Sequence, residues 1–281
     1  MKSQHPYLDI NGPMIFAHRG DSVHAPANTE PAFRLAVECG ADALETDIHW
    51  TKDGEIVVCH DDTVDAVSDG RGAIKDCSLA ELKALDFGYS FTPDGGMTFP
   101  YRGKGVQIMT LTELLTTFAT IRVNMDVKPK HPRSLRQLIQ TIHDCDAQWR
   151  VMIASFHSRP LKMLRGLNSR LATSASTEEA AQFWLKSRLG IRSRPSLPYL
   201  ALQVPLKMGA IQVVTKRFIH SAHAAMQDVH IWTIDDEQEM IYLLELGVDG
   251  LVTNNPALAV AVRERWIGST RMATGGLTWK S

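Results

Sequence analysis

The stretch Leu44-Glu45-Thr46-Asp47-Ile48-His49 alternates apolar or uncharged residues with titratable ones. Because alternate side chains of an extended strand share a face, this pattern predicts a strand with Glu45, Asp47 and His49 on one side. Two carboxylates on one face of an otherwise apolar strand raise the free energy of the folded state unless a cation lies beside them. Their oxygen atoms suit a hard divalent ion, Mg²⁺ or Ca²⁺, better than Zn²⁺.

In two neighbouring segments, a short apolar run is followed directly by a histidine. Residues 14–17 run into His18-Arg19-Gly20, and residues 56–59 end at His60. Imidazoles near neutral pKa can transfer protons, and the guanidinium group of Arg19 suits a phosphate. A solvated edge strand with structural histidines would explain any one of these segments. Their recurrence favours a catalytic site.

Together with segments farther along, these residues resemble the glycerophosphodiester phosphodiesterase family, in order and over nearly the whole chain. The matching segments are His18-Arg19-Gly20, Ala25-Pro26-Ala27-Asn28-Thr29, residues 40–47, Thr51-Lys52-Asp53-Gly54, His60-Asp61, Asp126-Val127-Lys128, Trp232-Thr233 and residues 247–256. Three positions depart from the family pattern. Ala27 and Asp126 stand where Glu is usual, and Asn254 stands where Asp is common.

Length and composition predict one soluble α/β domain spanning residues 1–281, since no Pro/Gly/Ser-rich linker divides the chain. Its formal net charge is −1, with both signs interspersed, which argues against a nucleic-acid partner. The four cysteines lack Cys-x-x-Cys spacing. The family resemblance implies that Cys39 lies on a helix and Cys59 on a strand, so both are expected to be buried thiols. Without an apolar signal core or an apolar run of membrane length, we expect a cytoplasmic protein with no integral membrane segment. The sequence carries no signal for an oligomeric state.

Short β-rich runs alternate with amphipathic helical stretches, a pattern typical of a parallel sheet wound with helices. Eight strands are expected, at residues 14–18, 44–49, 123–128, 151–156, 170–174, 199–204, 230–233 and 250–253. Helices are expected at residues 28–39, 111–119, 134–143, 216–226 and 236–246. This order predicts a (β/α)₈ TIM barrel, in which functional groups gather at the carboxyl ends of the strands.

The barrel pattern breaks after the second strand, over about residues 61–110. Fifty residues are too many for a simple connection, so we expect an inserted subdomain. The family has an insertion at this place, and the resemblance implies that it shapes the substrate pocket. Its Phe87, Tyr89, Phe91, Met97, Phe99 and Tyr101 either line an apolar channel or form a small core of the insertion itself.

The resemblance implies a role for each candidate site residue. Glu45, Asp47 and Asp126 would hold one divalent cation, for which Mg²⁺, Ca²⁺ and Mn²⁺ are all suitable. His18 and His60 would act as acid and base, Arg19 and Lys128 would bind the phosphate, and Trp232 would lie against the glycerol or alcohol moiety. Asn28 either caps the first helix or bonds behind His18 or Glu45.

The activity implied is metal-dependent hydrolysis of small glycerophosphodiesters, such as glycerophosphocholine and glycerophosphoethanolamine, to sn-glycerol 3-phosphate and an alcohol. One alternative is lysophospholipase D-type action on lysophospholipids, which would need an apolar channel near the rim. The other is a non-catalytic barrel that binds a phosphoryl ligand. Only Ala27 and Asp126 favour that alternative, since fold stability alone does not require the other charged residues.

Overall fold

Eight parallel strands form a barrel in the computed structural model, which describes residues 5–167, 170–193 and 196–273. In barrel order the strands are β6 (Ala172–Thr173), β5 (Val151–Ala154), β4 (Arg122–Val127), β2 (Ala43–Trp50), β1 (Met14–His18), β11 (Gly250–Thr253), β10 (Asp228–Trp232) and β7 (Ala201–Pro205). A parallel bridge from Ser174 to Ala201 links β6 to β7. The predicted (β/α)₈ barrel is therefore confirmed.

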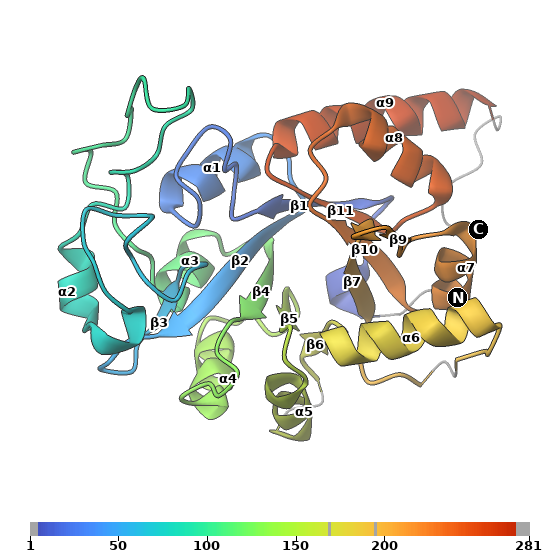
Figure 1. Ribbon diagram of the computed structural model, residues 1–281, viewed down its shortest axis with the longest axis horizontal. Coiled ribbons are helices and arrows are strands. Elements are labelled where there is room, and N and C mark those ends of the chain that lie inside the picture. The colour runs from blue at the N-terminus through green and yellow to red at the C-terminus, as the bar shows by residue number, and fades with distance from the viewer. Residues whose placement is uncertain (1–4, 168–169, 194–195, 274–281) are drawn as a thin grey trace.

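Helices surround these strands (Figure 1). They are α1 (Glu30–Glu38), α3 (Leu111–Thr117), α4 (Leu135–Asp144), α5 (Ser158–Leu167), α6 (Thr177–Leu189), α7 (Lys216–Ala224), α8 (Glu237–Leu246) and α9 (Pro256–Ala273). Several begin at hydroxyl or carboxylate caps, and Thr110 and Ser176 each form a capping box with a glutamate three residues later. None of the described helices is long and apolar enough to cross a membrane.

The barrel interior has two layers. The lower layer, toward the amino ends of the strands, is apolar, and the upper layer, toward their carboxyl ends, is polar. The lower layer is closed at its base by the short helix η1 (Pro6–Leu8). Its buried apolar residues are Tyr7, Leu8, Met14, Phe16, Ala43, Met152, Ala172, Ala201 and Val252. On β2 the inward face continues from Ala43 to Glu45 and Asp47, while Leu44 and Ile48 pack outward against the helices. The alternation expected for this strand is thus present.

The insertion leaves the barrel after β2 and lies at the left of Figure 1. The strand β3 (Ile56–Val58), which pairs antiparallel with β2, leads into the insertion, and the insertion contains the short helix η2 (Ile74–Asp76) and α2 (Leu79–Lys83). The insertion and the end of β3 share a core of buried apolar residues: Val57, Cys59, Val64, Ile74, Leu82, Phe87, Val106 and Ile108. Phe91 packs edge-on against Tyr101, and the Arg102 guanidinium lies over the rings of Tyr89 and Phe99. The aromatic residues therefore pack within the insertion.

All four cysteines are free thiols. Cys59 is buried in the core of the insertion, as expected. Cys39 is only half-buried, because it lies at the C-terminal cap of α1 rather than on its inner face. Burial raises the pKa of the Cys59 thiol to about 12, so this side chain acts as a small apolar residue.

Replacing Phe16 by alanine should lower the free energy of unfolding by about 3–5 kcal/mol, because it opens a cavity inside the barrel. The Phe16 side chain is fully buried, and its ring centroid lies 4.6 Å from that of His230. Urea unfolding would measure the loss. Phe91→Ala in the insertion is the control, and it should cost about 1 kcal/mol. Equal losses would contradict the view that the apolar layer holds the barrel together.

Candidate active site

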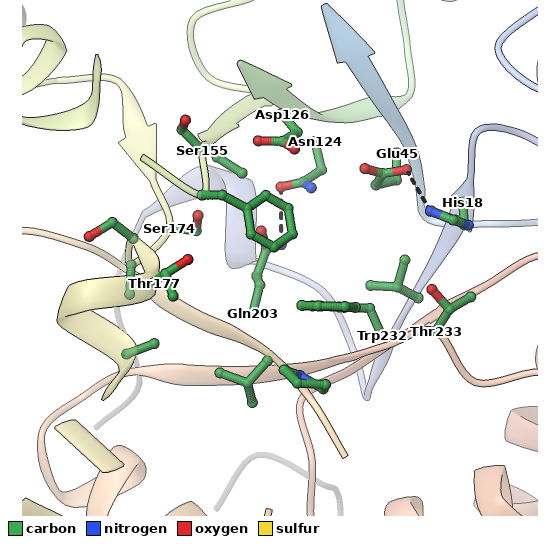
Figure 2. Close-up of a pocket in the computed structure, with 18 of the residues that line it drawn as sticks. His18, Glu45, Asn124, Asp126, Ser155, Ser174, Thr177, Gln203, Trp232 and Thr233 are labelled. Atoms are coloured by element: carbon green, nitrogen blue, oxygen red, sulfur yellow. Dashed lines mark hydrogen bonds and ion pairs between the residues drawn. The ribbon is translucent and has the colours of Figure 1, made fainter. Parts of the chain in front are cut away.

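A cavity of about 450 Å³ lies at the carboxyl ends of the barrel strands. Eight of its lining residues are those singled out from the sequence: His18, Arg19, Glu45, Asp47, His60, Asp126, Lys128 and Trp232. Figure 2 shows His18, Glu45, Asp126 and Trp232 projecting into this space from different strands. The structure thus brings the candidate residues together, over a sequence separation of more than 200 residues.

Strand register accounts for this convergence. His18 on β1 is the partner of Glu45 on β2, and Asp47 on β2 is the partner of Asp126 on β4. Partners on neighbouring strands of a barrel point to the same side, so these four side chains form one row at the top of the interior.

Asp47 is the most heavily bonded carboxylate of the site. Lys128 Nζ lies 2.8 Å from Asp47 Oδ1, and Arg19 Nε lies 3.4 Å from Asp47 Oδ2. The same Oδ2 accepts a hydrogen bond of 3.1 Å from Asn28 Nδ2, whose own Oδ1 accepts one from Thr46 Oγ1 at 2.7 Å. Asn28 therefore does not cap α1 but holds Asp47 in place, with Asp47 rather than His18 or Glu45 as its partner. Its φ of +60° is one that asparagine tolerates.

Lys128 joins Asp47 to the third carboxylate, since its Nζ also lies 2.8 Å from Asp126 Oδ2. Burial works against the charge of this lysine, but the facing carboxylates of Asp47 and Asp126 raise its pKa above the ordinary value. The ammonium group is therefore fixed as a positive charge in the cavity.

Negative charge still exceeds what the protein itself compensates. Burial, and then the charges of Asp47 and Asp126, raise the pKa of Glu45 well above its usual value, and burial raises that of Asp126 as well. Asp126 Oδ1 is buried without a hydrogen-bond partner. Three carboxylates with a free oxygen form a donor set that fits one hard divalent cation. The described residues contain no ready-made cluster of three metal-ligating side chains, and Lys128 lies between two of these carboxylates.

The two histidines have different surroundings. His18 Nδ1 lies 2.7 Å from Asn254 Oδ1, and its Nε2 lies 3.9 Å from Glu45 Oε2. Burial, and then the nearby Arg19 charge, lower the pKa of His18. His60 is more exposed, and its Nδ1 lies 2.6 Å from Asp61 Oδ1. His49, to which the sequence gives no role, is buried and bonds through Nε2 to the His60 carbonyl oxygen at 3.2 Å.

The rest of the cavity lining is mostly apolar, and apart from Trp232 its apolar residues were not expected from the sequence. It is built by α6, by the hairpin of β8 (Lys207–Met208) and β9 (Ile211–Gln212), and by residues after β5 and β10. Its larger members are Phe156, Trp184, Met208, Ile211, Val213 and Trp232. Phe156 packs edge-on against Trp232 with 5.7 Å between ring centroids. Trp184 lies four residues after Ala180, a spacing that indicates one helix face and that could have been found by first placing a helix there.

The pocket-shaping role inferred for the insertion does not match this lining. Among the described residues, none within 61–110 lines the cavity, and His60, which does line it, directly precedes the insertion. The physical reason is that the aromatic residues of the insertion pack against one another and against Arg102. The apolar wall comes from α6 and the β8–β9 hairpin instead.

Comparison with known proteins gives concordant matches. The model of the glycerophosphoryl diester phosphodiesterase family matches residues 18–258. The chain is 32% identical over 272 residues to a probable glycerophosphodiester phosphodiesterase 2 of Mycobacterium tuberculosis, covering 94% of this chain and 96% of the relative. It is 30% identical to a glycerophosphodiester phosphodiesterase of Bacillus altitudinis, covering 89% and 98%.

Solved structures show the same fold. A glycerophosphoryl diester phosphodiesterase domain from Mycobacterium tuberculosis superposes with a TM-score of 0.78 at 18% identity, covering 90% of this chain and 100% of that domain. A phosphodiesterase from Oleispira antarctica, solved in complex with the product sn-glycerol-3-phosphate, superposes with a TM-score of 0.70 at 24% identity, covering 90% and 97%.

Replacing Lys128 by methionine should lower the free energy of unfolding by about 3 kcal/mol in EDTA, since it leaves two buried carboxylates without their ammonium partner. Protonation of the carboxylates removes their charge, so the loss should shrink as the pH falls. Urea unfolding at several pH values would measure it. Lys83→Met is the matched control, because it breaks the Lys83–Glu113 pair at the surface of the insertion and should cost under about 1 kcal/mol. A Lys128→Met loss no larger than that of the control would contradict this account.

Proposed function

Because this chain belongs to the glycerophosphoryl diester phosphodiesterase family, whose members are phosphoric diester hydrolases, we propose that it hydrolyses small glycerophosphodiesters. Glycerophosphocholine and glycerophosphoethanolamine are the proposed substrates, and sn-glycerol 3-phosphate and the free alcohol are the products. The observation that carries the proposal is the convergence of two histidines, three carboxylates and two cationic side chains on one cavity. This convergence also argues against the non-catalytic alternative, since Asp126 retains a place in the carboxylate row despite its shorter side chain.

Binding of the phosphate is assigned to the fixed positive charges. Lys128 Nζ supplies a point charge, and Arg19 at the end of β1 supplies a planar fork of donors that can reach two phosphate oxygens. Arg19 Nε is buried without a hydrogen-bond partner, although it lies 3.4 Å from Asp47 Oδ2. A phosphate oxygen would give this donor a partner.

One divalent cation, Mg²⁺ or Ca²⁺, with Mn²⁺ as a third option, would be held by Glu45, Asp47 and Asp126. When bound, it would neutralise charge that develops on the phosphate oxygens. The free Asp126 Oδ1 and the raised pKa of Glu45 support this assignment, because both indicate carboxylate charge that the protein leaves uncompensated.

Proton transfer is assigned to the two histidines. The neutral form that burial favours at His18 suits a general base, and its Nε2 would accept the proton of an attacking glycerol hydroxyl. The oxygen attacks phosphorus, the bond to the alcohol oxygen breaks, and His60 protonates the departing alkoxide. The cyclic phosphate formed is then opened by water, which gives its proton to His60 while His18 returns its proton to the glycerol oxygen. The Asp61 carboxylate, which faces His60 Nδ1, orients that ring.

Replacing His18 by alanine should reduce the release of sn-glycerol 3-phosphate about 10²- to 10⁴-fold, because it removes the acid/base group. The assay uses glycerophosphocholine and glycerophosphoethanolamine, first with EDTA and then with Mg²⁺, Ca²⁺ or Mn²⁺ added back. We expect release only with an ion present. His131→Ala, at an exposed histidine outside the cavity lining, is the control and should match the wild type. Release that persists in EDTA would remove the metal from the proposal, and equal activity of the two variants would remove His18.

A second candidate substrate class, the lysophospholipids, is favoured by the apolar wall of the cavity. Beyond the charged row, the cavity is bounded by α6 and the β8–β9 hairpin, whose Met208 and Ile211 line it while remaining largely exposed. An acyl chain on the glycerol side of the diester would bury apolar surface there, and each buried methylene contributes about 0.8 kcal/mol. Small diesters remain the first candidate, because the relatives that this chain matches are named glycerophosphodiester phosphodiesterases.

Replacing Ala181 by tryptophan should lower kcat/KM for lysophosphatidylcholine about tenfold, since the larger side chain displaces roughly two methylenes of chain from the apolar wall. Hydrolysis of glycerophosphocholine should be unchanged. Gln182→Trp is the matched control, because the neighbouring residue does not line the cavity. No lysophospholipid hydrolysis by the wild type, or an equal loss on both substrates, would argue against an acyl chain at this wall.

A further inference from the structure

His18 is held by a chain of hydrogen bonds that begins at Asp235, in the loop between β10 and α8. Asp235 Oδ1 accepts from the backbone N–H of Asn254 at 2.7 Å and from Thr253 Oγ1 at 2.9 Å. Asp235 Oδ2 accepts from Asn254 Nδ2 at 2.7 Å. On its other side, Asn254 Oδ1 lies 2.7 Å from His18 Nδ1 and accepts from Ser22 Oγ at 3.0 Å.

The direction of each bond in this chain follows from chemistry. An ionised carboxylate only accepts hydrogen bonds, so the Asn254 atom that faces Asp235 must be the amide nitrogen. The Asn254 oxygen must then face His18 and Ser22, which fixes the orientation of the amide. Because that oxygen can only accept, His18 Nδ1 must carry a hydrogen. In neutral His18, the lone pair therefore lies on Nε2.

His18 Nε2 is the ring nitrogen on the cavity side. It lies 3.9 Å from Glu45 Oε2, and Figure 2 shows the two side chains facing each other. The alternative tautomer would carry a hydrogen at this position and could not accept a proton from a bound hydroxyl.

We propose that Asp235 is a positioning residue that sets the ring tautomer of His18 through the amide of Asn254. Its consequence for catalysis rests on the proposed function, in which His18 Nε2 is the general base. A carboxylate at position 254 would accept from His18 whichever way it turned. An amide presents an acceptor in one orientation and a donor in the other, so Asn254 needs a second group to direct it.

The fold holds both ends of this chain in place. Asn254 directly follows β11, which pairs with β1 so that Thr253 is the partner of Ala17. The loop carrying Asp235 is tied to β11 by the bond from Ile234 N to Val252 O at 2.9 Å. The carboxylate therefore meets three donors of residues 253 and 254 from a fixed position.

Asp235→Asn provides the sharpest test, because it changes only one atom of the side chain. The oxygen of the new amide must face the Asn254 backbone N–H, which places its nitrogen opposite the Asn254 side chain. The Asn254 amide must then turn over and present its nitrogen to His18, which moves the His18 hydrogen from Nδ1 to Nε2. We expect kcat on glycerophosphocholine to fall about 100-fold with little change in KM. Asp235→Ala offers no competing donor and should cost less.

The double variant Asp235→Asn/Asn254→Asp should restore the chain with its amide and carboxylate exchanged. The carboxylate at position 254 would accept both from the amide nitrogen at position 235 and from His18 Nδ1. We expect kcat to return to within about tenfold of the wild type. Rescue by a second substitution distinguishes a directed hydrogen-bond chain from a purely structural role for Asp235.

The tautomer can be read without any activity, from the ¹⁵N shifts of the His18 ring at neutral pH, assigned by comparison with His18→Ala. Wild type and double variant should carry hydrogen on Nδ1, and Asp235→Asn should carry it on Nε2. Asp236→Asn is the matched control, because it keeps an N-cap residue on α8 and should leave both readouts unchanged. Hydrogen on Nδ1 in Asp235→Asn, or on Nε2 in the wild type, would overturn the proposal. The expected shifts without hydrolysis by any form would support Asp235 as the positioning residue and refute the proposed function instead.

Discussion

Three carboxylates at the top of one barrel interior are the constraint on which the rest of the site depends. Water cannot screen charges that lie this deep, so each must be met by a fixed partner. Asp47 has three such partners in Lys128, Arg19 and Asn28. Glu45 accepts a hydrogen bond of 3.2 Å from the backbone N–H of Arg19, and His18 Nε2 lies 3.9 Å from its Oε2. Burial and the neighbouring carboxylates raise the pKa of Glu45 despite these contacts. This uneven compensation supports the proposed binding of a cation and a phosphate by the same row.

Packing of the apolar lower layer stabilises the fold and offsets the unfavourable free energy of burying the three carboxylates. Alternation along β2 places Ala43, Glu45 and Asp47 on the inward face, so polarity increases toward the carboxyl end of the strand. Below the charged row, Phe16, Met152 and Val252 fill the barrel, and Tyr7 closes its base. Stability therefore comes mainly from the lower layer and from the helices outside. The upper layer can then carry groups that are unfavourable for folding and necessary for chemistry.

Sequence reasoning recovered the barrel and the charged row because both depend on local pattern. A two-residue period fixes the face of a strand, and short motifs at strand ends fix where His18, Glu45 and Lys128 lie. It did not recover α5 or α6, since Pro160 lies inside α5 and the inner face of α6 is weakly apolar, with Phe183 as its main buried side chain. The apolar wall was missed with α6. The bond from Asn28 to Asp47 could not be predicted, because it joins residues on separate elements and no local sequence pattern indicates it.

The asymmetry between the two histidines follows from the elements that carry them. His18 lies on a barrel strand, where burial favours its neutral form and the neighbouring strand end supplies Asn254. His60 lies just beyond β3, where the chain leaves the barrel for the insertion, and its partner Asp61 is adjacent in sequence. The His18 ring is thus oriented by Asn254, more than 200 positions away in sequence, and the His60 ring by the adjacent Asp61. The two imidazoles are therefore not equivalent, because they lie at different depths in the barrel. In the proposed two-step displacement, the more buried ring acts first as the base and the more exposed ring acts first as the acid.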